Sequence, residues 1–395
     1  MVFERFLELV MPQSGELFEK IIYIPGNHDH HMWEIARETQ YANYIQKIDW
    51  NEPLPRPWHT TNMFVKKNSP LVPAYFLSKL KKRNPHLSKF KIFIAYPNFG
   101  LVKEKSQKCV IFHHGHFTEP IYQLMSVLKR KIFPEREKAR HVWDVETENF
   151  AWIDFFWSTM GRSGDVGEEV ESIYENMLSP EKFKKFLSAR IDAIKKEYNL
   201  PGWDWLFAET LKKIVPSLVD HITGLERHQT AEQPNPSLRK GLKSYLEGPL
   251  KEQIQIERKQ NMPYDVTFVF GHTHKPFQKD MNFDGYPQWV DVYNTGGWIV
   301  DTVVPRPSHG GAIIFIDERL NVTSLHMYHE GDDPAEYAVK VEQATHEGEA
   351  ENPLYHRIFD LVDSSTEPWS TFADTVARAV NLREKNLHTK LNEKE

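Results

Sequence analysis

Three short apolar runs in this sequence each end in a loop that carries histidines. The runs cover residues 21–24, 109–112 and 266–270 and are rich in β-branched and aromatic side chains, which favour strands. The loops that follow them are Gly26-Asn27-His28-Asp29, His113-His114-Gly115-His116 and Gly271-His272-Thr273-His274. Ligand-binding residues of α/β proteins gather where strands end. The pattern therefore predicts an α/β protein with one polar site built from three loops.

The rest of the chain divides into segments of different periodicity. Apolar residues follow a helical spacing over 119–132, 146–160, 180–197, 205–222 and 236–258. Further strands are predicted at 90–96, 289–293 and 298–300, and a hairpin at 312–327. We therefore expect a discontinuous core (1–117 and 260–328), a helical insertion or cap (118–259), and an acidic segment with a C-terminal helix (329–395).

Composition excludes several classes of protein. Hydrophobic residues make up 40% of the chain and aromatic residues 13%, which excludes general disorder. A net charge of -6 argues against a broad nucleic-acid surface. The single cysteine excludes an internal disulfide and any multi-cysteine metal site, so the 19 histidines are the candidate transition-metal ligands. The sequence has no membrane-spanning apolar run and no secretory signal, and we expect a cytoplasmic protein.

The histidine loops have metal-binding chemistry, although each also has a simpler interpretation. On an extended backbone His272 and His274 would point to the same side, and two imidazoles aimed together can serve one metal ion or two adjacent ions. Taken alone, either of the two later loops is more simply a polar loop, and residues 27–31 could form a turn capped by Asn and Asp. The occurrence of three such loops after three strands favours a metal site.

These motifs resemble the later motifs of the calcineurin-like metallophosphoesterase superfamily. The matching segments are Gly26–Asp29, Tyr96-Pro97, His114-Gly115-His116, Gly271–His274 and the turn Asn294-Thr295-Gly296-Gly297-Trp298. They lie within residues 20–117 and 260–328. The resemblance implies a β-sandwich flanked by helices, with two divalent metal ions, usually Mn, Fe, Zn or Mg, at the strand ends.

The resemblance also implies a role for each matching residue. Asn27, His114 and His272 would bind one metal ion and His274 the other. His28 would protonate the leaving group or stabilise the oxyanion. His116 would contact the substrate, while a supporting role behind the ligands and a role as a plain loop histidine stay open as alternatives.

The implied reaction is hydrolysis of a phosphate ester or anhydride. Two metal ions clamp the phosphate oxygens and activate a bridging hydroxide, and a histidine neutralises the leaving oxygen. The substrate would be a phosphorylated small molecule, a nucleotide or a lipid-linked phosphate. In placement, the helical insertion resembles the cap of the UDP-diacylglucosamine hydrolases of lipid A synthesis. Its aromatic runs at 150–157 and 203–207 would either pack its own core or contact an apolar part of the substrate.

The sequence departs from the family before Gly26. The family's two earlier motifs, Asp-x-His and Gly-Asp-x-x-Asp, supply the remaining ligands and the bridging carboxylate, whereas residues 1–25 contain no Asp and no His. We expect an N-terminally truncated form that lacks the first βαβ portion and holds at most one metal ion weakly, so the activity of this chain stays open. The alternative is a non-catalytic binding protein that uses the helical insertion for partner contacts.

Overall fold

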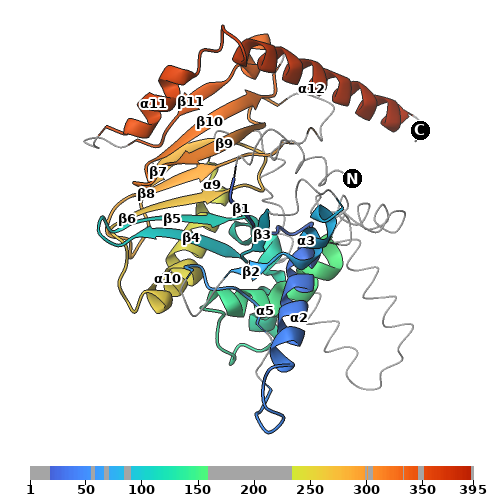
Figure 1. Ribbon diagram of the computed structural model, residues 1–395, viewed down its shortest axis with the longest axis vertical. Helices are drawn as coiled ribbons and strands as arrows, with labels where there is room; N and C mark the ends of the chain where they lie inside the picture. Colours follow the sequence, from blue (N-terminus) through green and yellow to red (C-terminus); the bar gives the residue numbers. More distant parts are fainter. Residues whose placement is uncertain are drawn as a thin grey trace. The chain divides into compact units, whose positions relative to one another are not determined.

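The computed structural model of this 395-residue chain is a mixed α/β structure (Figure 1). It describes residues 18–54, 58–65, 71–83, 90–158, 234–298, 300, 306–331, 333–345 and 351–392. The helices expected at 180–197 and 205–222 and the aromatic run at 203–207 lie outside these residues. The chain divides into two compact units, Met1–Phe99 with Pro120–Gly224, and Gly100–Glu119 with Leu225–Glu395. The division into core, insertion and C-terminal segment is not decided by these units and stays a prediction.

The first unit is built around a small sheet with strand order β1-β3-β2. The strands of this sheet are β1 (Lys20–Tyr23), β2 (Val72–Pro73) and β3 (Lys91–Ile94). The same unit contains the helices α2 (His31–Ile45) and α3 (Tyr75–Lys81). β1 runs parallel to β3, and β2 runs antiparallel to it. Trp33, Ile92 and Tyr96 are buried in the core of this unit. The strands expected at 21–24 and 90–96 are thus confirmed. Residues 27–30 form bends and a turn, in agreement with the simpler interpretation of this loop, and α2, which was not predicted, begins directly after them at His31.

Helices complete the described part of the first unit. They are the 3-10 helix η3 (Pro120–Gln123), α4 (Leu124–Ile132), α5 (Val142–Trp152) and the π-helical turn η4 (Ile153–Ser158). The helices expected at 119–132 and 146–160 are confirmed, the second as far as residue 158, where the described residues end, and α5 begins earlier than expected. The buried Asn149 joins two of them, because its side chain accepts from Met125 N at 2.9 Å and donates to Ser126 Oγ at 2.7 Å.

The second unit contains a five-stranded sheet with strand order β4-β5-β6-β8-β7. Its strands are β4 (Asn98–Lys103), which begins at the end of the first unit, β5 (Lys108–His113), β6 (Asp265–Phe270), β7 (Phe277–Met281) and β8 (Val290–Asn294). β5, β6 and β8 are parallel, and β7 is antiparallel to β8. β6 is buried along almost its whole length, as expected for a parallel strand covered on both faces.

Helices and a second sheet cover the two faces of this five-stranded sheet. On one face, Tyr245 at the end of α9 (Pro236–Tyr245) lies 6.3 Å from the Phe268 ring, centroid to centroid. The helix continues through the π-helical turn η6 (Leu246–Leu250) into α10 (Lys251–Glu257). On the other face, Val269 and Tyr293 share a core with Val322 of the second sheet. The parallel sheet is therefore the middle layer of this unit.

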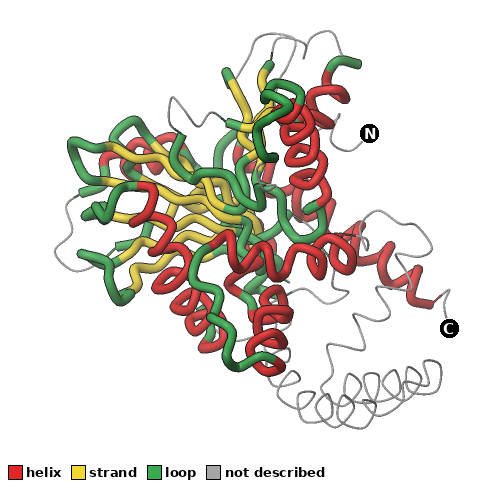
Figure 2. Tube along the Cα trace, turned by 90° about the horizontal axis from the view of Figure 1, so that it is seen from below, coloured by secondary structure: helices red, strands yellow, loops and turns green. Residues whose placement is uncertain are grey.

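The second sheet is antiparallel and has strand order β11-β10-β9. It comprises β9 (Gly310–Ile316), β10 (Val322–His329) and β11 (Lys340–Glu342), accompanied by the 3-10 helix η7 (Pro334–Tyr337), α11 (Pro353–Leu361) and the long α12 (Trp369–Asn392). Figure 2 shows the strands side by side, with loops at their ends. The hairpin expected at 312–327 and the C-terminal helix are confirmed.

One expected strand is wrong in the residues that the structure describes. At 298–300, Trp298 lies in a bend rather than in a strand. The chain leaves β8 through Gly296, which bridges to Gly311, and the Trp298 ring lies over Gly311, where an added Cβ would come within 3.2 Å of it. The Trp298 ring thus packs on the backbone of β9, and Trp298 itself is not part of a strand.

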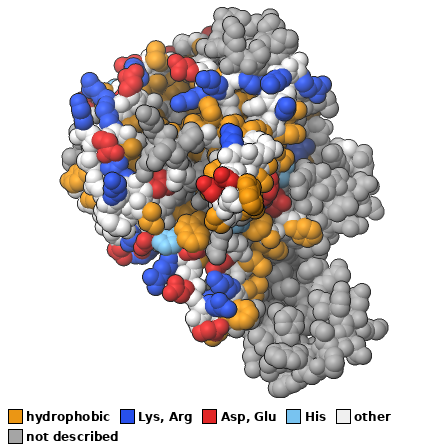
Figure 3. Space-filling model, turned by 60° about the horizontal axis from the view of Figure 1, so that its bottom comes forward, with side chains coloured by type: hydrophobic (Ala, Val, Ile, Leu, Met, Phe, Trp, Pro, Cys, Tyr) orange, Lys and Arg blue, Asp and Glu red, His pale blue; other side chains and the backbone are white. Residues whose placement is uncertain are grey.

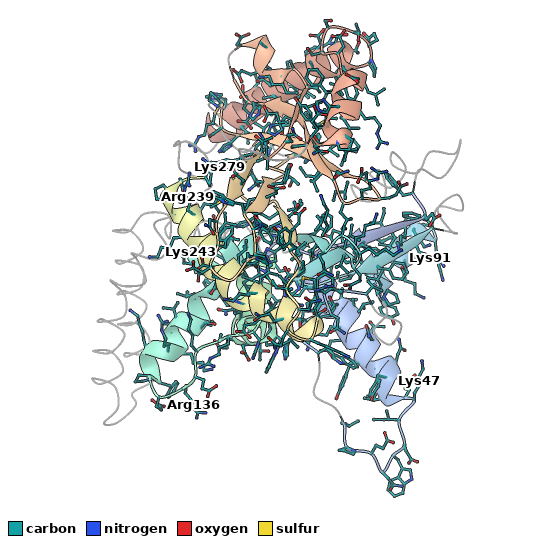
Figure 4. The ribbon with its side chains drawn as sticks, turned by 90° about the vertical axis from the view of Figure 1, so that its left-hand side faces the viewer. Lys47, Lys91, Arg136, Arg239, Lys243 and Lys279 are labelled. Atoms are coloured by element: carbon teal, nitrogen blue, oxygen red, sulfur yellow. The ribbon has the colours of Figure 1, made fainter. Side chains whose placement is uncertain are left out.

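The surface of the described residues carries charges of both signs. Figure 3 shows basic and acidic side chains on one face, with hydrophobic side chains between them. On α9, the exposed Arg239 and Lys243 extend from the same side of the helix (Figure 4), while Leu238 and Leu242 are buried. No described helix has both the length and the apolar character needed to span a bilayer.

Candidate metal centre

The carboxyl ends of β5, β6 and β8 carry three of the expected motifs. Pairing in register aligns His113 with Phe270, and Phe270 with Asn294, so the loops 113–116, 271–274 and 294–297 all leave the same edge of the sheet. Backbone hydrogen bonds continue past the strands, from Gly271 N to His114 O at 3.0 Å and from Thr295 N to Phe270 O at 2.8 Å. Strand geometry therefore brings these three loops together.

Three of the predicted histidines of the second unit lie close together. The ring centroids of His114 and His272 are 5.1 Å apart, and those of His114 and His116 are 5.4 Å apart. The two Nδ1 atoms of His114 and His116 are 3.3 Å apart. His116 is fully buried, His114 is partly buried, and the side chain of His272 is only 9% exposed. His114 and His272 are thus the pair of predicted metal ligands that this unit brings together.

A carboxylate that sequence reasoning missed contacts this group. Glu119 Oε2 lies 3.1 Å from His272 Nε2, and both side chains are nearly buried. A carboxylate in contact with an imidazole is the usual partner that orients a metal-binding histidine. The sequence contains one weak signal for this role, because Glu119 follows His116 by three residues within the same loop.

Gly115 allows the 113–116 loop to approach the 271–274 loop closely. Its φ of +121° lies in a region that side chains with a Cβ rarely adopt, and an added Cβ would lie 2.7 Å from the Cβ of His272. The absence of a side chain here is therefore required both by the backbone conformation and by the packing.

The backbone of the 271–274 loop differs from the expected extended form. His272 and His274 have φ values of 75° and 60°, in the left-handed region that costs residues other than glycine about 1 kcal/mol or more. The expectation that alternation along a strand aims both rings to one side is therefore wrong. His274 lies against Gly297, where an added Cβ would come within 2.7 Å of its ring. Residues other than glycine with positive φ, such as these two candidate ligands, are common in functional loops.

His113, at the end of β5, has a packing role. It is buried, and its ring stacks on Phe117 and Phe268 at centroid distances of 5.9 and 6.2 Å. Its Nδ1 accepts a hydrogen bond from Gly115 N at 2.8 Å. Burial, together with the nearby His272, lowers the pKa of His113 to about 3, because burial disfavours the charged imidazolium. His113 is therefore a neutral side chain that supports the loop.

The first unit holds the two remaining predicted residues, Asn27 and His28. Asn27 is fully buried and its Nδ2 donates to Tyr122 Oη at 3.2 Å, while its Oδ1 has no hydrogen-bond partner among the residues that the structure describes. A buried amide oxygen without a partner requires an explanation, and metal ligation is one. His28 is exposed, and its ring is nearly perpendicular to that of Trp157 at 6.5 Å between centroids. Asp29 closes the loop by accepting from Gly26 N at 2.5 Å and from Tyr23 Oη.

A buried ion pair follows this loop directly. His30 Nε2 lies 2.8 Å from Glu146 Oε1, both side chains are completely buried, and Tyr96 Oη donates to the other oxygen of Glu146 at 2.9 Å. Burial alone would lower the pKa of His30, but the charge of Glu146 and the hydrogen bonds to Asp154 and Glu146 raise it to about 9. Sequence reasoning missed Glu146, which is 116 residues from His30, and the sequence contains no signal for this contact.

The predicted ligand set fits a metal ion only in part. Within the described ranges of the chain, no group of three or more His, Cys, Asp or Glu side chains is arranged to hold a metal ion. The second unit brings His114 and His272 together, and Asn27 in the first unit has an unpaired amide oxygen. Imidazole nitrogen and amide oxygen suit several first-row divalent ions. The chemistry of the donors fits a metal ion, while the full set of ligands stays a prediction.

Comparisons of the chain with protein-family models, with curated proteins and with solved structures found no match. The resemblance to the metallophosphoesterases therefore depends on the motifs of the sequence.

Proposed function

We propose that this protein is a metal-dependent phosphoesterase, with a metallophosphoesterase-type core, that hydrolyses a phosphate ester or anhydride. The observation that carries the proposal is the approach of His114 and His272 to 5.1 Å at the carboxyl edge of parallel strands, where α/β proteins place ligand-binding residues. The left-handed backbone at His272 and His274 also supports it.

The residues of the chain then have distinct roles. A divalent ion, when bound, polarises phosphate oxygens and lowers the pKa of water. His114 and His272 are proposed as its imidazole ligands, with Asn27 as an amide-oxygen ligand, in a site that this chain holds weakly. His274 is proposed as a ligand of the second ion that full-length members of the family bind, and this chain is expected to hold no more than the first ion. Because Glu119 contacts His272 Nε2, we propose Nδ1 as the atom of His272 that binds the metal ion.

Two histidines are proposed to act on the substrate rather than on the metal. His28 is exposed and can therefore reach a leaving-group oxygen as its proton donor. His116 is fully buried beside His114, and we assign it to binding of a phosphate oxygen. The substrate is a phosphorylated small molecule, a nucleotide or a lipid-linked phosphate, and the proposed location is the cytoplasm.

Metal binding by the purified chain tests the proposal. Co²⁺ is titrated while its visible absorption is recorded, because a tetrahedral or five-coordinate site with nitrogen ligands gives characteristic bands. We expect His114→Ala and His272→Ala each to weaken Co²⁺ binding at least about tenfold. His356→Ala, an exposed histidine on α11, is the matched control and should bind as the parent does. Equal binding by all four proteins, or no binding by the parent, would contradict the proposal.

Hydrolysis separates the proposal from its alternative. The incomplete metal group within the described residues favours a non-catalytic binding protein. Release of nitrophenol from bis-p-nitrophenyl phosphate with Mn²⁺, lost in His272→Ala and retained in His356→Ala, would support the enzyme. Metal binding with no hydrolysis of this ester or of p-nitrophenyl phosphate would support the binding protein.

A further inference from the structure

A pocket opens in the second unit at the starts of the parallel strands. Its volume is about 470 Å³, which is the size of a small-molecule site. It is lined by the residues at which β5, β6 and β8 begin, by the turn before β10 and by the start of α11. The histidine loops leave the opposite ends of the same strands. Because a six-residue strand spans about 20 Å, the pocket is a different site from the histidine loops.

The face of the sheet that lines the pocket changes from polar to apolar along each strand. On β6, Asp265 and Thr267 come before Val269, and on β8 Asp291 comes before Tyr293. Side chains two residues apart share a face, and register pairing aligns Thr267 with Asp291 and Val269 with Tyr293. The apolar ends pack against the second sheet. The pocket therefore lies where the packing between the two sheets ends, and its floor is polar.

The floor and rim of the pocket are acidic. Among the described residues that line it, Asp265, Asp291 and Glu351 are carboxylates, and Lys108 is the one cation, which leaves a formal charge of -2 (three carboxylates against one ammonium). Lys108 Nζ pairs with Asp265 Oδ2 at 3.1 Å. A concave surface of one charge raises the local concentration of the opposite charge. The pocket should therefore attract a cation and repel an anion such as a phosphate ester.

Two large aromatic side chains stand at the rim of the pocket. Tyr264 and Trp289 come just before β6 and β8 and are 57% and 48% exposed, respectively. The Tyr264 hydroxyl accepts a hydrogen bond from Gln288 Nε2 at 2.6 Å, which restrains the ring. Aromatic faces beside carboxylates bind organic cations, because the ring quadrupole and the negative charges act on the same ligand.

We propose that this pocket binds an organic cation, a protonated or quaternary amine carried on an apolar body about the size of one ring. The ammonium group would be held by Asp291 and Glu351, and the apolar body would pack on Trp289 and Tyr264. This inference uses no residue of the histidine loops and is independent of the proposed phosphoesterase function.

Calorimetric titration with benzylamine tests this inference, because benzylamine is a protonated amine on a single ring at pH 7. We expect one site per chain, with binding that weakens as salt is raised. Trp289→Ala and Asp291→Asn should each weaken binding at least about threefold, the effect expected for loss of a cation–π contact or of a charged partner. Trp143→Ala on α5 and Asp284→Asn, which are exposed and outside the pocket, are the matched controls.

Two outcomes of this titration would contradict the proposal. Benzyl alcohol has the same ring without the charge, and binding as tight as that of benzylamine would overturn the assignment to cations. Absence of benzylamine binding, or equal binding by parent and pocket variants, would overturn the site itself. Glu351→Gln, at an exposed position two residues before α11, serves as a second charge variant if circular dichroism shows that Asp291→Asn does not fold. Its weakened binding would support the proposal, and unchanged binding would contradict it.

Discussion

The buried pair of His30 and Glu146 makes a sharp prediction about stability. The two side chains are completely buried with 2.8 Å between Nε2 and Oε1, and the pKa of His30 is raised to about 9 from its usual 6.5. At about 1.4 kcal/mol per pH unit, this difference corresponds to about 3 kcal/mol of folding free energy from the protonated imidazole. Replacement of Glu146 by Gln keeps the shape of the side chain and removes its charge. We therefore expect Glu146→Gln to lower the free energy of unfolding by about 3 kcal/mol at pH 6.

The pH dependence gives the sign of the effect. A raised pKa in the folded state means that the stabilisation is fully present below pH 6.5, where the imidazole of the unfolded chain is also protonated. The stabilisation is lost as the pH rises through about 9, where His30 of the folded protein loses its proton. The parent should therefore lose stability between pH 6.5 and pH 9, and Glu146→Gln should lack this particular loss.

Two measurements check this prediction. Urea unfolding at pH 6 and pH 9.5 gives the stability difference, and an NMR titration of histidine ring carbons gives the pKa of His30. Glu148→Gln is the matched control, because Glu148 lies on the same helix and pairs with the partly exposed Lys129. It should cost less than about 1 kcal/mol. An inflection of His30 at or below pH 6.5 in the parent, or equal costs for the two Gln variants, would refute the reasoning.

Three further predictions concern the second unit. Gly115→Ala should lower the free energy of unfolding by at least about 2 kcal/mol, because φ is +121° and the new Cβ would lie 2.7 Å from His272; a thermal unfolding midpoint equal to the parent's would contradict this. The ring of His113, with a pKa of about 3 caused mainly by burial, should show no NMR titration between pH 5 and pH 8, and an inflection near pH 6.5 would argue against its neutral packing role. Burial raises the pKa of Glu330 to about 7, because the buried carboxylate is less stable in its charged form. The folded protein therefore loses stability as the pH rises through 7 and Glu330 becomes ionised. Glu330→Gln should therefore raise the unfolding midpoint at pH 8 more than at pH 4, and an equal change at both values would rule out this account.

The strands and the loops after them were predictable because their signals are local. The β-branched and aromatic runs at 21–24, 109–112 and 266–270 became β1, β5 and β6, and their ends moved by no more than one residue. Alternation and composition over four to six residues depend on the chain itself and on a half-buried environment that any sheet supplies. The positions at which candidate metal-binding side chains follow strands could therefore be predicted from the sequence.

Elements whose local pattern is weak were missed. β4 begins directly after Pro97, which lies just past the end of the strand expected at 90–96, so no second strand was expected there. β7 has the sequence Phe-Gln-Lys-Asp-Met, in which only the two end residues are buried and the three between them are polar. α2 follows a loop of turn-forming residues and has few apolar positions, with Trp33 and Ala36 among those that are buried. In each case, packing against neighbours decided the structure over local propensity.

Contacts between distant segments were outside the reach of sequence reasoning. Glu119 meets His272 across 153 residues, and Glu146 meets His30 across 116. No periodicity links such positions, because the fold alone sets which segments become neighbours. The left-handed backbone of His272 and His274 was missed for the same reason, since it depends on how the loop packs against Gly115 and Gly297.

The sequence by itself determined the types of donor group and their places after strands, and the tertiary structure decided what each histidine can do. His30 and His113 are the same kind of side chain and both are buried, yet the pKa of His30 is about 9 and that of His113 is about 3. His30 faces the carboxylate of Glu146, whereas His113 is enclosed by aromatic rings. Burial disfavours charge unless a partner compensates for it, and only the folded chain supplies or withholds that partner.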